Sequence, residues 1–119
     1  MTNQTSNGVE KIYNKLVRDN VPEIIEADGG APKIRALTGE EFIVELLNKL
    51  KEEAEEVVKA KADRQELIKE IGDVYEVIDA IIDNCGLNRE EIMRLKSQRK
   101  IEHGGFTKKI FLESVNLPH

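Results

Sequence analysis

The sequence predicts an all-α fold, an antiparallel helical hairpin plus a third helix that form a bundle when copies of the chain associate. Three long segments carry apolar residues three and four positions apart, and each segment follows a capping residue. Of the 119 residues, 34% are charged and 4% are aromatic, as expected for helices with one polar face. The length suits one domain, expected over residues 9–119 after a disordered polar tail at 1–8.

Short elements are expected ahead of the hairpin. Pro22 suits the first turn of a helix over residues 21–27, which the glycines after Asp28 would end. Residues 33–37 (KIRAL) alternate in the manner of a strand, and residues 109–113 near the C-terminus also look extended. These two segments are therefore expected to pair as a two-stranded ribbon.

The three long helices share the same boundary signals. A residue that accepts hydrogen bonds precedes each helix, and a glutamate at the third helical position completes a capping box. Glycines follow the second and third helices, where they favour termination. The predicted helices run from after Thr38 to near Ala62, from after Asp63 to Asn84, and from after Asn88 to just before Gly104.

Four acidic residues on the first two helices are expected to converge. At about 100° per residue, Glu53 borders the apolar stripe of the first helix and Glu56 lies one turn further along the same flank. Glu70 and Asp73 occupy the matching flank of the second helix. A short connection favours an antiparallel hairpin, which brings the two flanks to one side at matching levels.

Convergence of these carboxylates predicts a metal site. Like charges repel, so such a cluster is stable only if most of its members are neutralised. Mg²⁺ does this well because it takes oxygen ligands and shares its shell with substrate phosphates. The alternative is that all four acids are solvated helix surface, which is the expectation for their neighbours Glu52 and Glu55.

Three blocks of sequence also carry a family resemblance. LKEEAEEVVKA (50–60) followed by EIGD (70–73) has the form ExxE…ExxD. KLVRDNVPEIIEADG (15–29) precedes it, and HGGF…IFLE (103–113) follows it. Together these blocks resemble the MazG-like all-α nucleoside triphosphate pyrophosphohydrolases, in particular a small house-cleaning branch related to phosphoribosyl-ATP pyrophosphohydrolase. The resemblance covers nearly the whole chain after its first ten residues.

The resemblance implies Mg²⁺-dependent cleavage of a nucleoside triphosphate between its α and β phosphates, giving a monophosphate and pyrophosphate. Glu53, Glu56, Glu70 and Asp73 would be the metal ligands, with Mn²⁺ as an alternative ion. Glu53 lies nearest the apolar boundary and is the candidate catalytic residue, accepting a proton from the attacking water. The resemblance further implies a homodimer or homotetramer.

The triphosphate also requires cationic side chains. Arginine suits bidentate contact with phosphate, and lysine supplies a compact charge. The candidates are Lys15 and Arg18 ahead of the hairpin, and Arg99 and Lys100 near the end of the third helix. For each of them, an ordinary surface charge is the alternative.

Charge and composition exclude several classes of protein. A net charge of −5 opposes general binding to nucleic acid. No apolar run approaches the ~20 residues of a membrane span, and the N-terminus lacks the features of a signal peptide. The single cysteine, Cys85, cannot form an internal disulfide and is expected in the core. A cytoplasmic enzyme is expected, with no membrane or nucleic-acid partner.

Two alternatives to a nucleoside triphosphate pyrophosphohydrolase stay open. One is a related enzyme that acts on another phosphorylated small molecule, such as phosphoribosyl-ATP. The other is a non-catalytic helical interaction module, in which the acids only keep the surface soluble.

Overall fold

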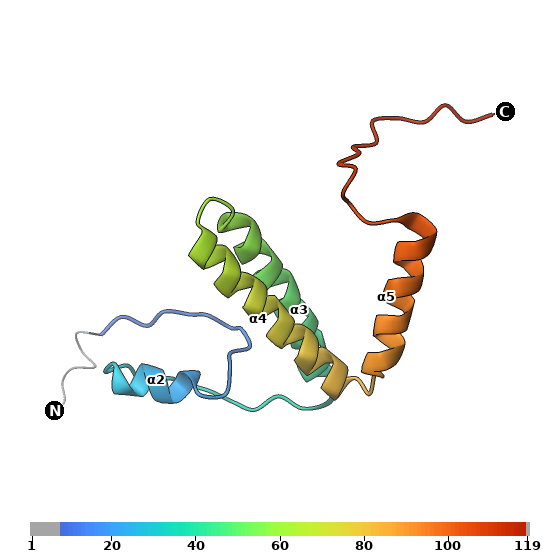
Figure 1. Ribbon diagram of the computed structural model, residues 1–119. Coiled ribbons are helices and arrows are strands. Elements are labelled where there is room, and N and C mark those ends of the chain that lie inside the picture. Colours follow the sequence, from blue (N-terminus) through green and yellow to red (C-terminus); the bar gives the residue numbers. More distant parts are fainter. Residues whose placement is uncertain (1–7, 119) are drawn as a thin grey trace. The chain divides into compact units, whose positions relative to one another are not determined.

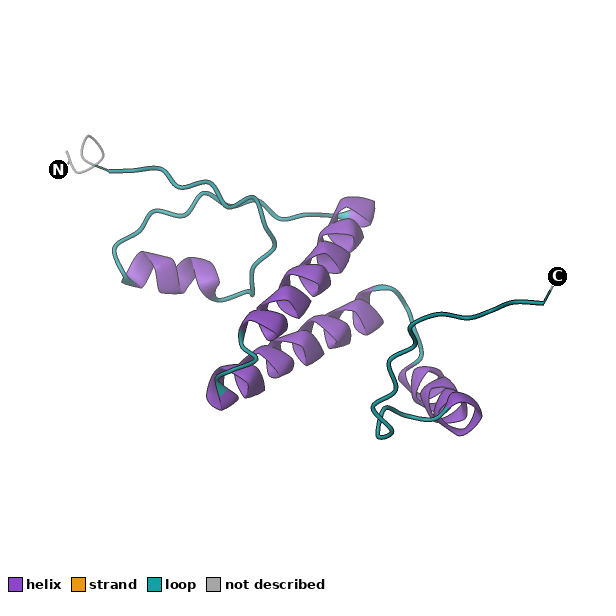
Figure 2. Cartoon of the chain, turned by 90° about the horizontal axis from the view of Figure 1, so that it is seen from above, coloured by secondary structure: helices purple, strands orange, loops and turns teal. Residues whose placement is uncertain are grey.

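A computed structural model describes residues 8–118, and this part of the chain contains helices and connecting segments with no strand (Figures 1 and 2). The predicted all-α class is confirmed for these residues, whereas residues 1–7 of the expected disordered tail lie outside them. The chain divides into two compact units, Met1–Cys85 and Gly86–His119. The helices are α2 (Val21–Ala27), α3 (Gly39–Lys59), α4 (Arg64–Asn84) and α5 (Arg89–His103).

α3 and α4 lie side by side and antiparallel, and they form the hairpin of the first unit (Figures 1 and 2). The buried apolar side chains between them are Leu46 from α3, and Val77 and Ile82 from α4. Burying an aliphatic side chain contributes about 1.5–3 kcal/mol, so these residues supply much of the attraction between the helices. α3 ends at Lys59 rather than near Ala62, because the chain turns over residues 60–63.

Side-chain caps begin two of the helices as predicted. The carboxylate of Asp63 accepts a hydrogen bond from the backbone N–H of Glu66 at 3.1 Å. The side chain of Asn88 accepts one from the backbone N–H of Glu91 at 2.9 Å. Each contact satisfies a donor that the first turn of a helix leaves without an intrahelical partner, so α4 and α5 start where the sequence indicates.

The ribbon expected between residues 33–37 and 109–113 is wrong, since neither segment is a strand. An isolated two-stranded ribbon is marginal in water, and Arg35 instead holds its segment to α3. Its guanidinium donates two hydrogen bonds to Glu41, at 2.7 and 3.2 Å. Thr38 occupies the cap position of α3 without a side-chain cap hydrogen bond, so the capping box expected there is also wrong.

The position of Cys85 corrects another expectation. It lies at the cap that follows the last residue of α4, and its side chain is exposed rather than in the core. In the C-terminal unit, α5 ends as predicted at Gly104, whose φ of 83° is a conformation that glycine adopts without a Cβ clash. Among residues 8–118, no helix is both long and apolar enough to cross a bilayer.

Candidate functional site

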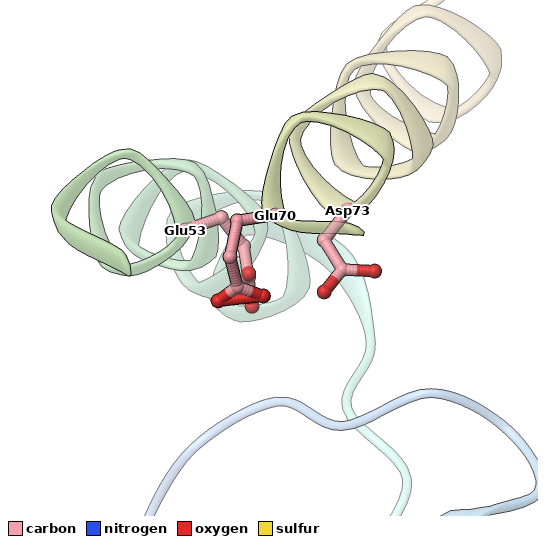
Figure 3. A group of neighbouring side chains, drawn as sticks. All are labelled: Glu53, Glu70 and Asp73. Atoms are coloured by element: carbon pink, nitrogen blue, oxygen red, sulfur yellow. The ribbon is translucent and has the colours of Figure 1, made fainter. Parts of the chain in front are cut away.

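The hairpin brings together three of the four carboxylates predicted as metal ligands (Figure 3). Glu53 comes from α3, and Glu70 and Asp73 come from α4. Each offers a carboxylate oxygen, and these oxygens lie within 4.8 Å of one another. The sequence separations explain this arrangement, because residues at similar distances from the connection of an antiparallel hairpin lie at the same level.

Two of these three carboxylates are buried. Glu53 is 9% exposed and Glu70 is 7% exposed, whereas Asp73 is half-buried. Glutamate is almost never so deeply buried unless it is paired, since removing a carboxylate from water costs several kcal/mol. Two buried glutamates on one side of the hairpin are therefore unusual in such a small core.

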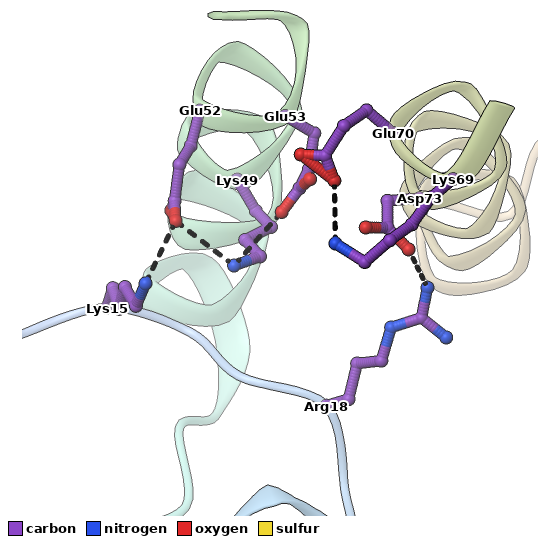
Figure 4. Close-up of polar contacts among 8 residues, drawn as sticks. All are labelled: Lys15, Arg18, Lys49, Glu52, Glu53, Lys69, Glu70 and Asp73. Carbon is purple, nitrogen blue, oxygen red and sulfur yellow. Dashed lines mark hydrogen bonds and ion pairs between the residues drawn. The ribbon is translucent and has the colours of Figure 1, made fainter. Parts of the chain in front are cut away.

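Each member of the carboxylate group contacts a cationic side chain (Figure 4). Two of the cations come from the hairpin helices themselves, and the third comes from the segment that precedes α2. This pairing explains how the buried carboxylates remain compatible with the fold. The pairs are Lys49 with Glu53 at 3.3 Å, Lys69 with Glu70 at 3.2 Å, and Arg18 with Asp73 at 2.7 Å.

Glu56, the fourth predicted ligand, lies outside the group in this structure. It is half-buried, and its Oε1 lies 3.5 Å from Nζ of Lys59, one turn along α3. Glu53 and Glu56 are three residues apart and so share a flank of the helix, but only Glu53 lies against the acidic residues of α4.

Glu52 is not the freely solvated residue that the sequence predicts. It is half-buried, and its Oε1 accepts hydrogen bonds of 3.2 Å from both Lys15 and Lys49. Burial acts to raise the pKa of Glu52, but these hydrogen bonds outweigh it and hold the pKa below its ordinary value. Glu55 is exposed, as predicted.

Both phosphate-binding candidates ahead of α2 contact acidic side chains of the hairpin (Figure 4). Lys15 contacts Glu52, and Arg18 contacts Asp73. Their side chains are 41% and 58% exposed, so each remains accessible to a ligand. The other two candidates, Arg99 and Lys100, are exposed residues of α5 and belong to the C-terminal unit.

Sequence reasoning missed the two lysines of the hairpin. Lys49 precedes Glu53 by four positions, a spacing that places opposite charges together on a helix, so this pair had a sequence signal. Lys69 directly precedes Glu70, and adjacent residues do not normally face each other on a helix, so this pair had none. The hydrogen bond to Glu70 raises the pKa of Lys69.

The donor set of Glu53, Glu70 and Asp73 fits a divalent cation. Carboxylate oxygens are the ligands that Mg²⁺ prefers, and such sites commonly combine a few carboxylates with water and substrate phosphate. The oxygens that lie within 4.8 Å of one another come from both helices. An ion held there would replace the separate lysine and arginine contacts as the source of positive charge.

Comparisons with protein-family models, with curated proteins and with solved structures gave no match for this chain. The chemistry of the site is therefore inferred from its own residues and their contacts.

Proposed function

We propose that this chain is a Mg²⁺-dependent nucleoside triphosphate pyrophosphohydrolase, with Mn²⁺ as an alternative ion. It would cleave between the α and β phosphates to give a nucleoside monophosphate and pyrophosphate, as a house-cleaning activity on nucleotides. The convergence of Glu53, Glu70 and Asp73 from two antiparallel helices carries the proposal. The three sequence blocks that resemble MazG-like pyrophosphohydrolases support it.

The carboxylates have two tasks in this proposal, and Glu53 takes part in both. Glu53, Glu70 and Asp73 hold the ion, with Glu56 as a fourth ligand on the motif match. When bound, Mg²⁺ neutralises phosphate charge and makes a coordinated water more acidic. Glu53 takes the proton of the attacking water, a role that general bases fill when they lie within hydrogen-bonding reach.

Cationic side chains next to the carboxylate group would bind the triphosphate. Lys15 and Arg18 are both partly exposed, and each contacts an acidic residue of the hairpin. They therefore lie close to where phosphates would meet the ion. Arg18 suits bidentate contact with a phosphate, whereas Lys15 acts as a point charge. Arg99 and Lys100 of α5 remain candidates from the sequence alone, because they belong to the C-terminal unit.

A homodimer or homotetramer is also part of the proposal. A hairpin with large exposed apolar side chains requires a cover, and a second copy of the chain supplies one of matching character. The exposed apolar side chains include Val44, Leu47 and Val58 on α3, and Ile68, Ile71 and Tyr75 on α4.

One observation favours a second candidate, the non-catalytic helical interaction module. Arg18, Lys49 and Lys69 already provide a positive partner for each carboxylate of the group. A neutralised cluster of this kind is stable without a metal ion. The exposed apolar side chains of α3 and α4 would then serve as the contact surface for a partner.

Release of pyrophosphate separates the two candidates. The full-length chain is incubated with Mg²⁺ and a panel of nucleoside triphosphates that also includes phosphoribosyl-ATP. We expect at least one substrate to release pyrophosphate, and we expect a chelator to abolish the release. Glu53→Gln and Asp73→Asn should each lower turnover by about 100-fold or more, because each removes a charged group that acts on the reaction.

Glu55→Ala is the matched control, since Glu55 is an exposed acid on the same helix. It should keep most of the activity. Glu52→Ala is a poorer control, because it would release Lys49, which also contacts Glu53. Equal losses in Glu53→Gln and Glu55→Ala, or no pyrophosphate from any substrate, would contradict the proposed function.

A further inference from the structure

We infer that Arg18 exchanges partners as ligands bind: it neutralises Asp73 in the metal-free chain and contacts a substrate phosphate once Asp73 binds the ion. The inference rests on the proposed function and deepens it. It assigns Arg18 a role that couples the two ligands, so that each ligand favours binding of the other.

The contact that must break is a direct one. Nη2 of Arg18 lies 2.7 Å from Oδ1 of Asp73, within the range of charge-assisted hydrogen bonds. Asp73 belongs to the carboxylate group, so an ion bound by this group competes with the guanidinium for the same side chain. Release of Arg18 is therefore a cost of metal binding.

Arg18 reaches the carboxylate group from outside the hairpin, whereas the two lysines lie on the hairpin helices. Lys49 and Lys69 lie on the same helices as their partners, four residues and one residue away. Arg18 lies 55 residues before Asp73 in the sequence, on a non-helical stretch, and its side chain is 58% exposed (Figure 4). Of the three cations, it is the one whose position does not depend on α3 or α4.

The guanidinium suits both partners. Only one of its two terminal nitrogens contacts Asp73 in this structure, and the planar fork also matches the oxygens of a phosphate. Once Asp73 is neutralised by the ion, the attraction that holds Arg18 there falls. A phosphate bound beside the ion then offers it a stronger negative partner.

The exchange predicts opposite effects of one substitution on the two ligands. Without nucleotide, Arg18→Gln removes the competitor for Asp73 and should tighten Mg²⁺ binding by about two- to fivefold, the range for a partly exposed ion pair. With the ion saturating, the same variant should bind a non-hydrolysable triphosphate analogue about tenfold or more weakly, because a hydrogen bond between charged groups is lost. Calorimetric titration of the full-length chain measures both affinities without turnover.

Arg35→Gln is the matched control for the metal titration. It removes the same guanidinium charge, but Arg35 forms its ion pair with Glu41 at the start of α3 and not with the carboxylate group. Its Mg²⁺ affinity should stay close to that of the unchanged chain. An equal gain in both variants would show a general charge effect and overturn the exchange.

A double variant tests whether Asp73 mediates the effect of Arg18→Gln on Mg²⁺ affinity. In Asp73→Asn, the partner of Arg18 has lost its charge, so adding Arg18→Gln should leave Mg²⁺ affinity unchanged, a non-additive result typical of groups in contact. An additive gain would overturn the exchange. Arg18→Lys keeps the charge and should give intermediate affinities for both ligands. Circular dichroism checks that each variant folds, and if Arg18→Gln does not fold, Arg18→Lys alone decides.

Failure of the inference and failure of the proposed function are distinguishable. If the unchanged chain binds neither Mg²⁺ nor Mn²⁺, the proposed function fails and the exchange fails with it. If the unchanged chain binds metal and Arg18→Gln changes neither affinity, only the exchange is overturned. Loss of both affinities in a folded Arg18→Gln would indicate a structural role for Arg18 and would also overturn the exchange.

Discussion

The α3–α4 hairpin and α5 are both helical, but only the hairpin has buried side chains within residues 8–118. α4 and α5 begin at side-chain caps of the same kind, so capping alone does not explain the difference. α3 and α4 each carry a broad apolar stripe, whereas apolar residues are sparse in α5. A cap is thus enough to start a helix, but burial requires two stripes that face each other.

The hairpin also buries apolar and acidic side chains in the same place. Its buried residues are the apolar Leu46, Val77 and Ile82 together with the acidic Glu53 and Glu70. A helix pair stabilised only by packing would place apolar residues at those two acidic positions, since buried charge is weak evidence for stability. Local rules are typically broken in this way at functional sites.

The largest effect on stability is expected from side-chain burial, the property in which the hairpin and α5 differ most. Leu46→Ala removes a buried side chain from the hairpin and should lower the free energy of unfolding by about 2–5 kcal/mol. Leu95→Ala makes the same change at an exposed position of α5 and should stay within about 0.5 kcal/mol. Urea denaturation at one fixed protein concentration measures both. Similar losses would refute the view that burial is confined to the hairpin.

Removing the side-chain caps should have a smaller effect on stability, and the effect should be confined to the unit that carries the substitution. Asp63→Ala deletes the cap of α4 and should lower the free energy of unfolding of the hairpin by about 1 kcal/mol. Asn88→Ala deletes the equivalent contact of α5 and should speed amide hydrogen exchange in α5, with exchange in α3 and α4 unchanged. Faster exchange throughout the chain in Asn88→Ala would show that the two units unfold together.

The smallest effect is expected from pH at the exposed start of α3. The hydrogen bond from Arg35 holds the pKa of Glu41 below its ordinary value of 4.5, so the folded chain favours the charged form. This contribution to stability is present above that ordinary value and is lost as the pH falls through the lowered pKa. Glu41→Gln should therefore flatten the loss of stability in acid, as urea unfolding measured across acidic pH would show. Glu40→Gln, in the same first turn, should retain the pH dependence of the unchanged chain.

The helices were predictable because their signals are local. Periodicity and caps indicated α3, α4 and α5 with small errors at the ends, and Pro22 indicated the start of α2. The side of the hairpin on which Glu53, Glu70 and Asp73 meet followed from about 100° per residue together with an antiparallel connection.

The misses came from interactions that local patterns do not encode. Arg18 reaches Asp73 across 55 residues, and Lys15 reaches Glu52 across 37, so neither pairing has a periodic signal. Ile71 and Ile78 belong to the apolar stripe of α4 but are exposed, while Val77 beside that stripe is buried. The rotation of a helix against its partner is set by tertiary packing, which the stripe indicates only approximately.

The central claim is that the carboxylates of the hairpin, unlike those of α5, form a metal site. Binding of Mn²⁺ to the full-length chain, followed by loss of the free-ion electron paramagnetic resonance signal, tests it most directly. Glu70→Gln should weaken binding by about tenfold or more, since even groups that only support a metal ligand have effects of that size. Glu90→Gln, at an exposed acid in the first turn of α5, should leave the affinity unchanged. Equal affinities in the two folded variants, or no binding by the unchanged chain, would contradict the claim.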